Sequence, residues 1–154
     1  MSGVSIEVCW DLVGERPLSD ERVVEVASAA LEFGKRRGLG LSVVFVDDAA
    51  LADLHGRYLG DDSPTDVMSF DLGEQTPGPG GELYVSVERA QARAGERGVS
   101  VGRELALYVV HGTLHLCGYD DHEPDDRASM RAAEHTVMAS LGFPVDDAPH
   151  EFGA

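Results

Sequence analysis

The segment that most constrains the fold is a run of apolar residues at positions 101–116, which carries two histidines near its end. Ser100 precedes the run and is a favourable helix N-cap, whereas Gly118 follows it and is a favourable stop. Apolar side chains occupy almost every face of such a helix: Val101, Leu105, Leu107, Val109, Val110, Leu114 and Leu116. A helix that is apolar all round is buried, so we predict a central helix on which the other elements pack.

The two histidines of this predicted helix, His111 and His115, lie four residues apart, and His122 follows after the glycine. A four-residue spacing places both imidazoles on one helix face, where they can bind one cation. The structural alternative is a pair of core histidines bonded to backbone carbonyls, but unpaired imidazoles in a core are costly. We therefore predict a metal site formed by these three histidines.

The three histidines and the residues near them in the sequence indicate which metal would bind and whether one coordination position is open. Three imidazole nitrogens with one open position are typical of zinc, although nickel, copper and iron also bind imidazole. Acidic residues within 120–123 could hold the outer imidazole nitrogens. Cys117 lies two residues from His115 and points away from this face, which favours an open position over a closed structural site. Gly112 stands where the protease motif His-Glu-x-x-His has its general base, so a protease is disfavoured.

Hydrophobic periodicity predicts the remaining elements. The predicted strands are residues 4–10, 41–46, 65–70 and 82–87, and 67–72 can pair with 82–87 as a long-looped hairpin. The predicted helices begin after Ser19, after Asp47 or Asp48, after Ser86, and at Pro124. We expect one domain over residues 1–154, with residues 145–154 as a frayed acidic tail.

The charge balance limits how the chain can meet nucleic acid. It has 28 acidic and 12 basic residues, a formal net charge of −16, whereas a general nucleic-acid binder is normally basic. Arg89, Arg93 and Arg97 are spaced four apart, which predicts a solvated helix face and makes them the best local candidates for RNA backbone contact. The basic residues 35–37 suit the negative end of the preceding helix better than a phosphate contact.

Cysteine content and hydropathy indicate the compartment. Cys9 and Cys117 are the only cysteines, too few for a disulfide framework. No apolar run approaches the roughly 18 to 20 residues that cross a bilayer, and residues 1–7 lack the basic and apolar regions of a secretory signal. We therefore expect the protein in a reducing cytoplasm.

Three sequence motifs resemble those of the YbeY family of bacterial rRNA-maturation endoribonucleases. The family signature His-Gly-x-Leu-His-Leu-x-Gly-Tyr-Asp-His is matched by residues 111–120, and Pro-Thr-Asp-Val-Leu-Ser-Phe by residues 64–70. The Gly-Asp-Ile-x-Ile-Ser strand of the family is similar to residues 81–86. The motifs occur in the family's order, and the resemblance covers nearly the whole chain.

The resemblance implies a fold and an activity. The fold would be α+β, a small four-stranded mixed sheet packed with about five helices, with a zincin-like metal-binding helix. One zinc ion would be held by three histidines, of which His111 and His115 match the family's ligands. The activity would be single-strand-specific RNA cleavage in 16S rRNA 3′-end maturation and ribosome quality control. The partners would be rRNA and the small ribosomal subunit with its proteins.

Two departures from the family pattern affect the site. The third histidine of the signature falls at Asp121, and His122 comes one position later. A one-residue bulge in the turn would restore three histidines, and we favour His122 over Asp121 as the third ligand. The family often has an arginine where this chain has Leu59; if that arginine binds the scissile phosphate, either Arg57 replaces it or the activity is weak or altered. Arg57 and His111 are therefore the expected catalytic residues.

Three functions follow from these patterns. In the first, zinc activates water or polarises a phosphoryl oxygen for RNA hydrolysis, and Asp66 either orients a ligand or holds a turn. The second is a non-catalytic, metal-stabilised ribosome-assembly factor, which the departure at Leu59 and the acidic composition favour. The third, a metal-dependent hydrolase of peptides or small molecules, is the weakest because Gly112 removes the general base.

Overall fold

Five helices and four strands make up the part of the chain that the computed structural model describes, residues 6–11, 14–36, 38–59, 66–73 and 79–143. This content confirms the predicted α+β class. The expectations for residues 4–5, 60–65, 74–78 and the tail 145–154 fall outside the described residues. In chain order the elements are β1 (Ile6–Trp10), α1 (Asp20–Phe33), β2 (Leu41–Val46), α2 (Asp48–Leu59), β3 (Val67–Asp71), β4 (Gly81–Ser86), α3 (Val87–Arg97), α4 (Val101–Leu116) and α5 (Pro124–Ser140).

The four strands form one mixed sheet in the order β1-β2-β4-β3. β1, β2 and β4 run parallel, and β3 runs antiparallel to β4. The predicted hairpin of β3 and β4 is confirmed, with Val67 opposite Val85 and Asp71 opposite Gly81. β3 is consequently an edge strand, and its register with β4 fixes which of its side chains face α4.

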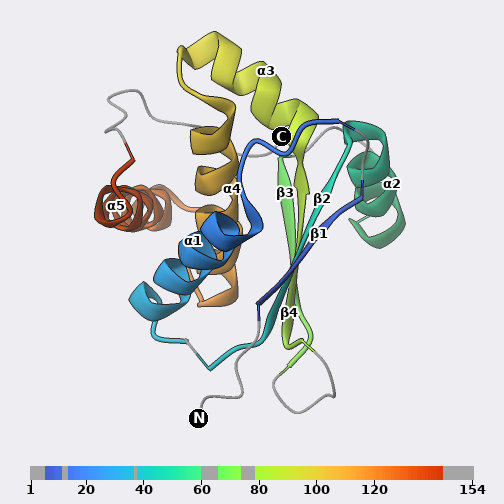
Figure 1. Cartoon of the computed structure of the whole chain (residues 1–154). Helices are drawn as coiled ribbons and strands as arrows, with labels where there is room; N and C mark the ends of the chain where they lie inside the picture. The colour runs from blue at the N-terminus through green and yellow to red at the C-terminus, as the bar shows by residue number, and fades with distance from the viewer. Residues whose placement is uncertain (1–5, 12–13, 37, 60–65, 74–78, 144–154) are drawn as a thin grey trace.

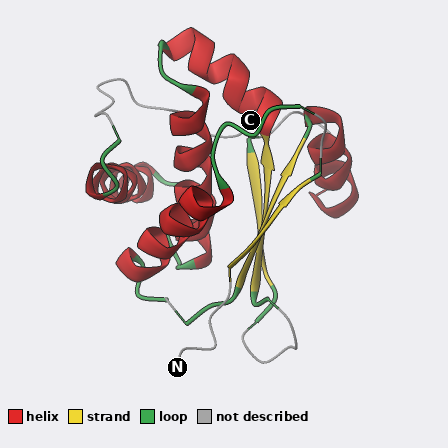
Figure 2. Ribbon diagram, in the orientation of Figure 1, coloured by secondary structure: helices red, strands yellow, loops and turns green. Residues whose placement is uncertain are grey.

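The helices cover the two faces of the sheet unequally. Figure 1 shows α1, α4 and α5 on one face and α2 on the other, with α3 over the upper end of α4. Figure 2 shows the same layers by secondary structure. The main hydrophobic core lies on the α4 side and includes Leu105, Tyr108 and Leu114, whereas a smaller cluster under α2 contains Leu51 and Met68.

The burial of α4 confirms the central helix predicted from its apolar run. Thirteen of its sixteen residues are buried, including the polar residues Arg103, Glu104, His111 and Thr113. Because the apolar side chains reach every face, α4 packs against α1, α3, α5 and the β3–β4 hairpin together. Within the described part of the chain, none of the helices has the length and hydropathy that a membrane crossing requires.

The helix starts also follow the sequence. Ser19, Ser86 and Ser100 each accept a hydrogen bond on the side chain from the backbone N–H three residues later, at 3.1 Å. For α2 the sequence left two possible caps, and the structure selects Asp47, whose Oδ1 accepts from the N–H of Ala50 at 2.8 Å. Each cap satisfies a backbone donor that the first turn of a helix leaves unpaired.

The basic residues after α1 have a different role from the predicted one. Arg36 lies beyond the end of α1, and its Nη1 donates to the carbonyl of Leu116, the last residue of α4, and to Asp71 Oδ2 on β3. The guanidinium thus binds the negative end of α4 rather than that of α1. Three segments distant in sequence meet at this side chain, next to the turn that leaves α4.

Candidate metal centre

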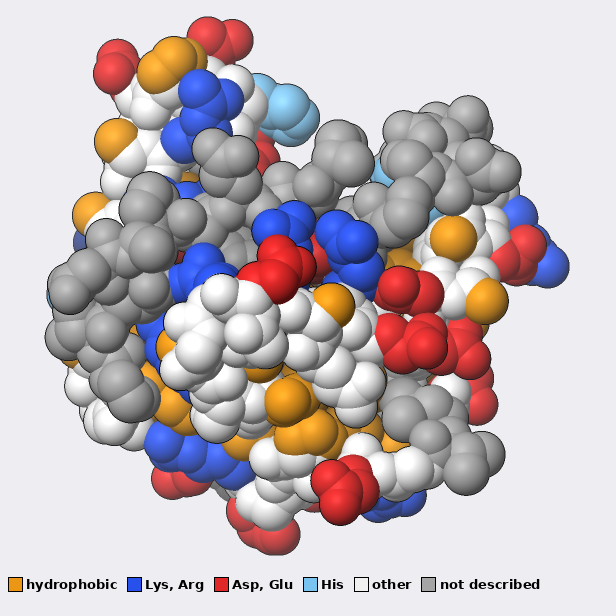
Figure 3. Space-filling model, turned by 90° about the horizontal axis from the view of Figure 1, so that it is seen from above, with side chains coloured by type: hydrophobic (Ala, Val, Ile, Leu, Met, Phe, Trp, Pro, Cys, Tyr) orange, Lys and Arg blue, Asp and Glu red, His pale blue; other side chains and the backbone are white. Residues whose placement is uncertain are grey.

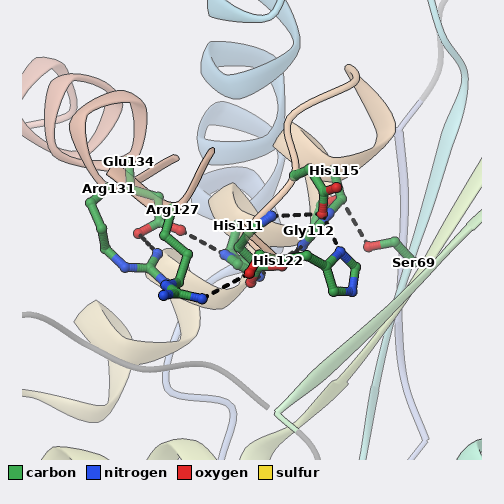
Figure 4. Close-up of polar contacts among 10 residues, drawn as sticks. Ser69, His111, Gly112, His115, His122, Arg127, Arg131 and Glu134 are labelled. Carbon is green, nitrogen blue, oxygen red and sulfur yellow. Dashed lines mark hydrogen bonds and ion pairs between the residues drawn. The ribbon is translucent and has the colours of Figure 1, made fainter. Parts of the chain in front are cut away.

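His111 and His115 lie side by side in the last two turns of α4, as their spacing predicts. Their Nε2 atoms are 3.1 Å apart, and the rings meet edge to face with centroids separated by 4.6 Å. His111 is 3% exposed and His115 is half-buried. Figure 4 shows both side chains between α5 and the strand that carries Ser69. The helix therefore presents two nitrogen donors to one point.

The turn after α4 brings a carboxylate to the same point. Gly118 has φ +102°, a left-handed conformation that favours glycine, and the N–H of Tyr119 donates to the carbonyl of Leu114 at 3.0 Å. The chain then folds back toward the helix. Asp121 Oδ2 lies 3.5 Å from His111 Nε2, and Asp121 Oδ1 lies 3.5 Å from His115 Nε2. The glycine turn predicted from the sequence therefore places Asp121 beside both histidines.

His122 occupies a different position from the one that the sequence interpretation gave it. Its side chain is 83% exposed, and its Nδ1 lies 2.5 Å from Asp120 Oδ1. This hydrogen bond raises the pKa of His122, and the charge of Asp120 adds to the effect. Two sets of side chains in the described residues have donor atoms close enough to share a metal ion. One set is His111, His115 and Asp121, and the other is Asp120, Asp121 and His122.

Two imidazole nitrogens and the two carboxylate oxygens of Asp121 surround a point where a small cation can bind. Zinc bonds of about 2.0–2.2 Å to nitrogen and oxygen place neighbouring ligand atoms of a tetrahedron about 3.3–3.5 Å apart. The separations here are 3.1 Å between the two imidazole nitrogens and 3.5 Å from each nitrogen to a carboxylate oxygen of Asp121. Two imidazoles and one carboxylate are ligands that zinc accepts, and non-haem iron uses the same set. The residues present can therefore hold a metal ion.

Glu134 of α5 orients the buried histidine. His111 Nδ1 lies 2.6 Å from Glu134 Oε2, and Arg131 Nη1 donates to Glu134 Oε1 at 2.6 Å. A carboxylate that accepts from Arg131 can also accept from an imidazole N–H, and a proton on Nδ1 of His111 leaves the lone pair of Nε2 facing Asp121 and His115. The sequence interpretation sought this carboxylate within 120–123; it noted Glu134 only as fitting the family's terminal helix and missed its contact with His111. Its signal was a charged residue on the otherwise apolar face of α5, beside Met130, Ala133, Val137 and Met138.

The electrostatics of His115 also suit metal binding. Burial lowers the pKa of His115, and the neighbouring His111 lowers it further, while Asp121, Asp120 and a hydrogen bond with the backbone of Tyr119 oppose the shift. The imidazole is consequently neutral at physiological pH. Neutral imidazole is the form that donates a lone pair to a metal.

Gly112 lets α4 approach the sheet closely. Its carbonyl accepts a hydrogen bond from Ser69 Oγ at 3.0 Å, and a Cβ at this position would lie 2.9 Å from Leu83 Cδ2 and 3.0 Å from Val67 Cγ2. A glutamate here would collide with β3 and β4. The close packing therefore gives a physical reason for the missing protease base noted in the sequence.

Arg57 and Asp66 lie apart from the histidines. Arg57 is on α2, on the opposite face of the sheet (Figure 1), and its Nε forms an exposed ion pair with Asp53 Oδ2 at 3.1 Å. Asp66 is fully buried, and its Oδ1 accepts from Arg89 Nε at 3.1 Å while its carbonyl accepts from the N–H of Ser86. Asp66 thus holds the start of β3 against α3. Of the two roles considered from the sequence, orienting a ligand or holding a turn, this contact is the structural one.

The arginine row of α3 is not the solvated face that its spacing predicts. Arg89 binds the buried Asp66, and Arg97 Nε lies 3.3 Å from Oε1 of the buried Glu104, which also lies 3.4 Å from Arg103 Nη1. Arg89 and Arg97 point inward because α4 and the residue preceding β3 supply carboxylates that the α3 sequence cannot reveal. Figure 3, a view from above, shows acidic and basic side chains interspersed across that surface.

Comparison with known proteins gives one consistent family. A sequence model described as Endoribonuclease YbeY matches residues 15–142. A protein named Endoribonuclease YbeY from Moorella thermoacetica is 42% identical over 142 residues, covering 85% of this chain and 90% of the relative. One with the same name from Symbiobacterium thermophilum is 39% identical, covering 80% and 87%. Another, from Mycolicibacterium smegmatis, is 39% identical, covering 79% and 75%.

The fold is similar to one solved structure, the solution structure of TM1509 from Thermotoga maritima. The TM-score is 0.58 at 23% sequence identity, and the match covers 90% of this chain and 92% of that one. At this level of identity the likeness supports the fold alone.

Proposed function

Because this chain belongs to the Endoribonuclease YbeY family, we propose that it is a zinc-dependent endoribonuclease that cuts single-stranded RNA in the maturation of the 3′ end of 16S rRNA. The family membership confirms the resemblance carried by the three sequence motifs. The observation that carries the proposal for this chain is the convergence of His111, His115 and Asp121 on one point.

We propose His111 and His115 as zinc ligands and Asp121 as the third. Asp121 is supported by the position of its carboxylate, in which Oδ2 lies 3.5 Å from His111 Nε2 and Oδ1 lies 3.5 Å from His115 Nε2. His122, which the sequence favoured, is the rival ligand. Against it stands its hydrogen bond to Asp120, because this bond and the exposed position of the ring would both have to change before Nδ1 or Nε2 reached the histidines.

The chemistry needs both the metal and the residues that position it. A zinc ion at this site supplies Lewis acidity, which polarises a phosphoryl oxygen or lowers the pKa of a bound water. Glu134 keeps the proton of His111 on Nδ1, so Nε2 stays available as a donor. Arg57 stays a prediction as the residue that neutralises the scissile phosphate, and its ion pair with Asp53 on the far face of the sheet counts against it.

The proposed setting is the bacterial ribosome. We propose rRNA of the small ribosomal subunit as the substrate, the subunit with its proteins as the partner, and ribosome quality control in the cytoplasm as a further role. The whole chain, residues 1–154, would act as one domain. Family membership supports the RNA substrate, and the cytoplasm is supported only by the composition described above.

Cleavage of single-stranded RNA by the purified protein tests the proposal. We expect the wild type loaded with zinc to cut an unstructured oligonucleotide and to leave a duplex of the same sequence intact. His111→Ala should lose roughly hundredfold or more in rate, because several kcal/mol of charge stabilisation depend on the metal. Equal rates for the two proteins would point to a contaminating nuclease and would contradict the proposal.

A non-catalytic ribosome-assembly factor is the second candidate, and the formal charge of −16 favours it because RNA phosphates would be repelled. It predicts that the zinc-loaded wild type cuts no RNA while still co-sedimenting with small ribosomal subunits. Cleavage that disappears in His111→Ala would exclude it.

A further inference from the structure

We infer that Arg127 binds the phosphate backbone of the RNA beside the candidate metal centre and supplies there the positive charge that the sequence analysis assigned to Arg57. The inference rests on the proposed function. It assigns a substrate contact to the first turns of α5, an element for which the sequence motifs indicated no such role.

Arg127 is attached directly to the turn that carries the proposed ligand. Its Nη1 donates to the carbonyl of His122 at 2.9 Å, one residue after Asp121. Arg131 lies one turn further along α5 on the same helix face and donates to Glu134, which in turn contacts His111. Figure 4 shows both guanidinium groups on the α5 side of the histidines. A phosphate held by Arg127 would thus lie next to the histidine cluster.

The positive charge of Arg127 is not paired with a carboxylate in the contacts that the structure shows for it. Its contact is with a neutral backbone carbonyl, and its side chain is exposed. Seven other arginines of the described chain form ion pairs with carboxylates: Arg22, Arg36, Arg57, Arg89, Arg97, Arg103 and Arg131. A carboxylate already bound to a guanidinium competes with a phosphate for it. Arg127 can therefore accept an anion at a smaller cost.

The chemistry of the guanidinium matches the substrate. Arginine presents five N–H donors in a planar fork and binds phosphate oxygens with two parallel hydrogen bonds. Only one of these donors is used by the carbonyl of His122. In a protein with a formal charge of −16 and acidic residues at 120, 121, 123, 125 and 126, a polyanion needs a local positive group at the point of cleavage. Arg127 supplies it from a rigid helix.

Binding of a 2′-O-methyl single-stranded RNA oligonucleotide to the zinc-loaded protein tests the inference, measured by fluorescence anisotropy at several salt concentrations. We expect Arg127→Ala to raise Kd about tenfold and to reduce the slope of log K against log salt by about 0.7, the value of one phosphate contact on a single strand. Arg127→Lys should recover part of the affinity. Arg16→Ala is the matched control, because Arg16 is exposed and contacts the neutral ring of Trp10; it should change Kd by less than about twofold.

Three outcomes would overturn the inference. Unchanged binding by Arg127→Ala, with cleavage still lost in His111→Ala, would remove Arg127 from the RNA site and leave the proposed function standing. Weaker binding accompanied by loss of zinc, measured by elemental analysis of the same sample, would show that Arg127 only supports the turn. A wild type that neither binds nor cuts RNA would defeat the proposed function itself.

Discussion

His111 and Asp121 are ten positions apart and meet because a single glycine reverses the chain. The left-handed conformation of Gly118 ends α4, and the next three residues lead back along the helix. In such a short turn the identity of the residue that faces the histidines depends on a register of one position. At present the structure places Asp121 there and His122 outside.

Metal content of two single variants tests this register. We expect His122→Ala to retain one zinc ion per chain by elemental analysis, because its side chain contacts Asp120 rather than the two helical histidines. Asp121→Ala should lose stoichiometric zinc, because it leaves only two ligands where a stable site uses at least three. Asp121→His, which restores the third histidine of the family signature, serves as the control and should keep the metal. Retained zinc in Asp121→Ala with loss in His122→Ala would reverse the assignment.

At the residue scale, the sequence could predict only the ligands that share one element. The spacing of His111 and His115 is sufficient to predict that they lie together, because residues four apart in a helix share one face. Asp121 and Glu134 depend on how the turn and α5 pack against α4, and local pattern carries no information on that packing. The family signature drew attention to the nearest histidine, His122, whereas the structure places Asp121 beside the two helical histidines.

Between elements, the contact of α4 with the β3–β4 hairpin depends on Gly112. We expect Gly112→Ala to lower the free energy of unfolding by about 1–3 kcal/mol, because the added methyl would lie 2.9 Å from Leu83 Cδ2 and the core must shift to admit it. Urea denaturation measures the change. Gly95→Ala on α3 is the control: its Cβ would meet nothing within 4 Å, so the better helix propensity of alanine should stabilise the protein by up to about 1 kcal/mol. Equal changes in the free energy of unfolding for the two variants would show that the close packing of α4 on the hairpin at Gly112 does not contribute to stability.

The elements themselves were largely predictable, whereas their partners were not. Ser19, Ser86 and Ser100 mark helix starts because a cap acts within three residues. The inward orientation of Arg89 and Arg97 depends on Asp66 and Glu104, which come from other elements. The insertion of β4 between β2 and β3 is likewise a long-range property, and periodicity along one strand cannot specify it.

For the whole molecule, a metal bound to α4 and to the turn before α5 joins parts of the chain that otherwise separate on unfolding. We expect chelation to lower the melting temperature. A ligand that binds only the folded state at a thousand times its Kd stabilises by about 4 kcal/mol, which corresponds to roughly 8–16 °C for a domain of this size. Differential scanning calorimetry with and without chelator measures the shift, and His111→Ala should show none. An equal shift in the variant would place the stabilising metal elsewhere.

α4 ends close to the candidate metal centre, since His111 and His115 lie in its last two turns. Aligned peptide dipoles place about half a negative charge at that end, and the molecule as a whole carries −16. Arg36 offsets part of this charge at the carbonyl of Leu116, and the negative charge that is left would repel a phosphate and attract a dication before metal binds. The dipole of one buried helix would thus favour a fixed order of binding, in which the cation binds first and the nucleic acid binds second.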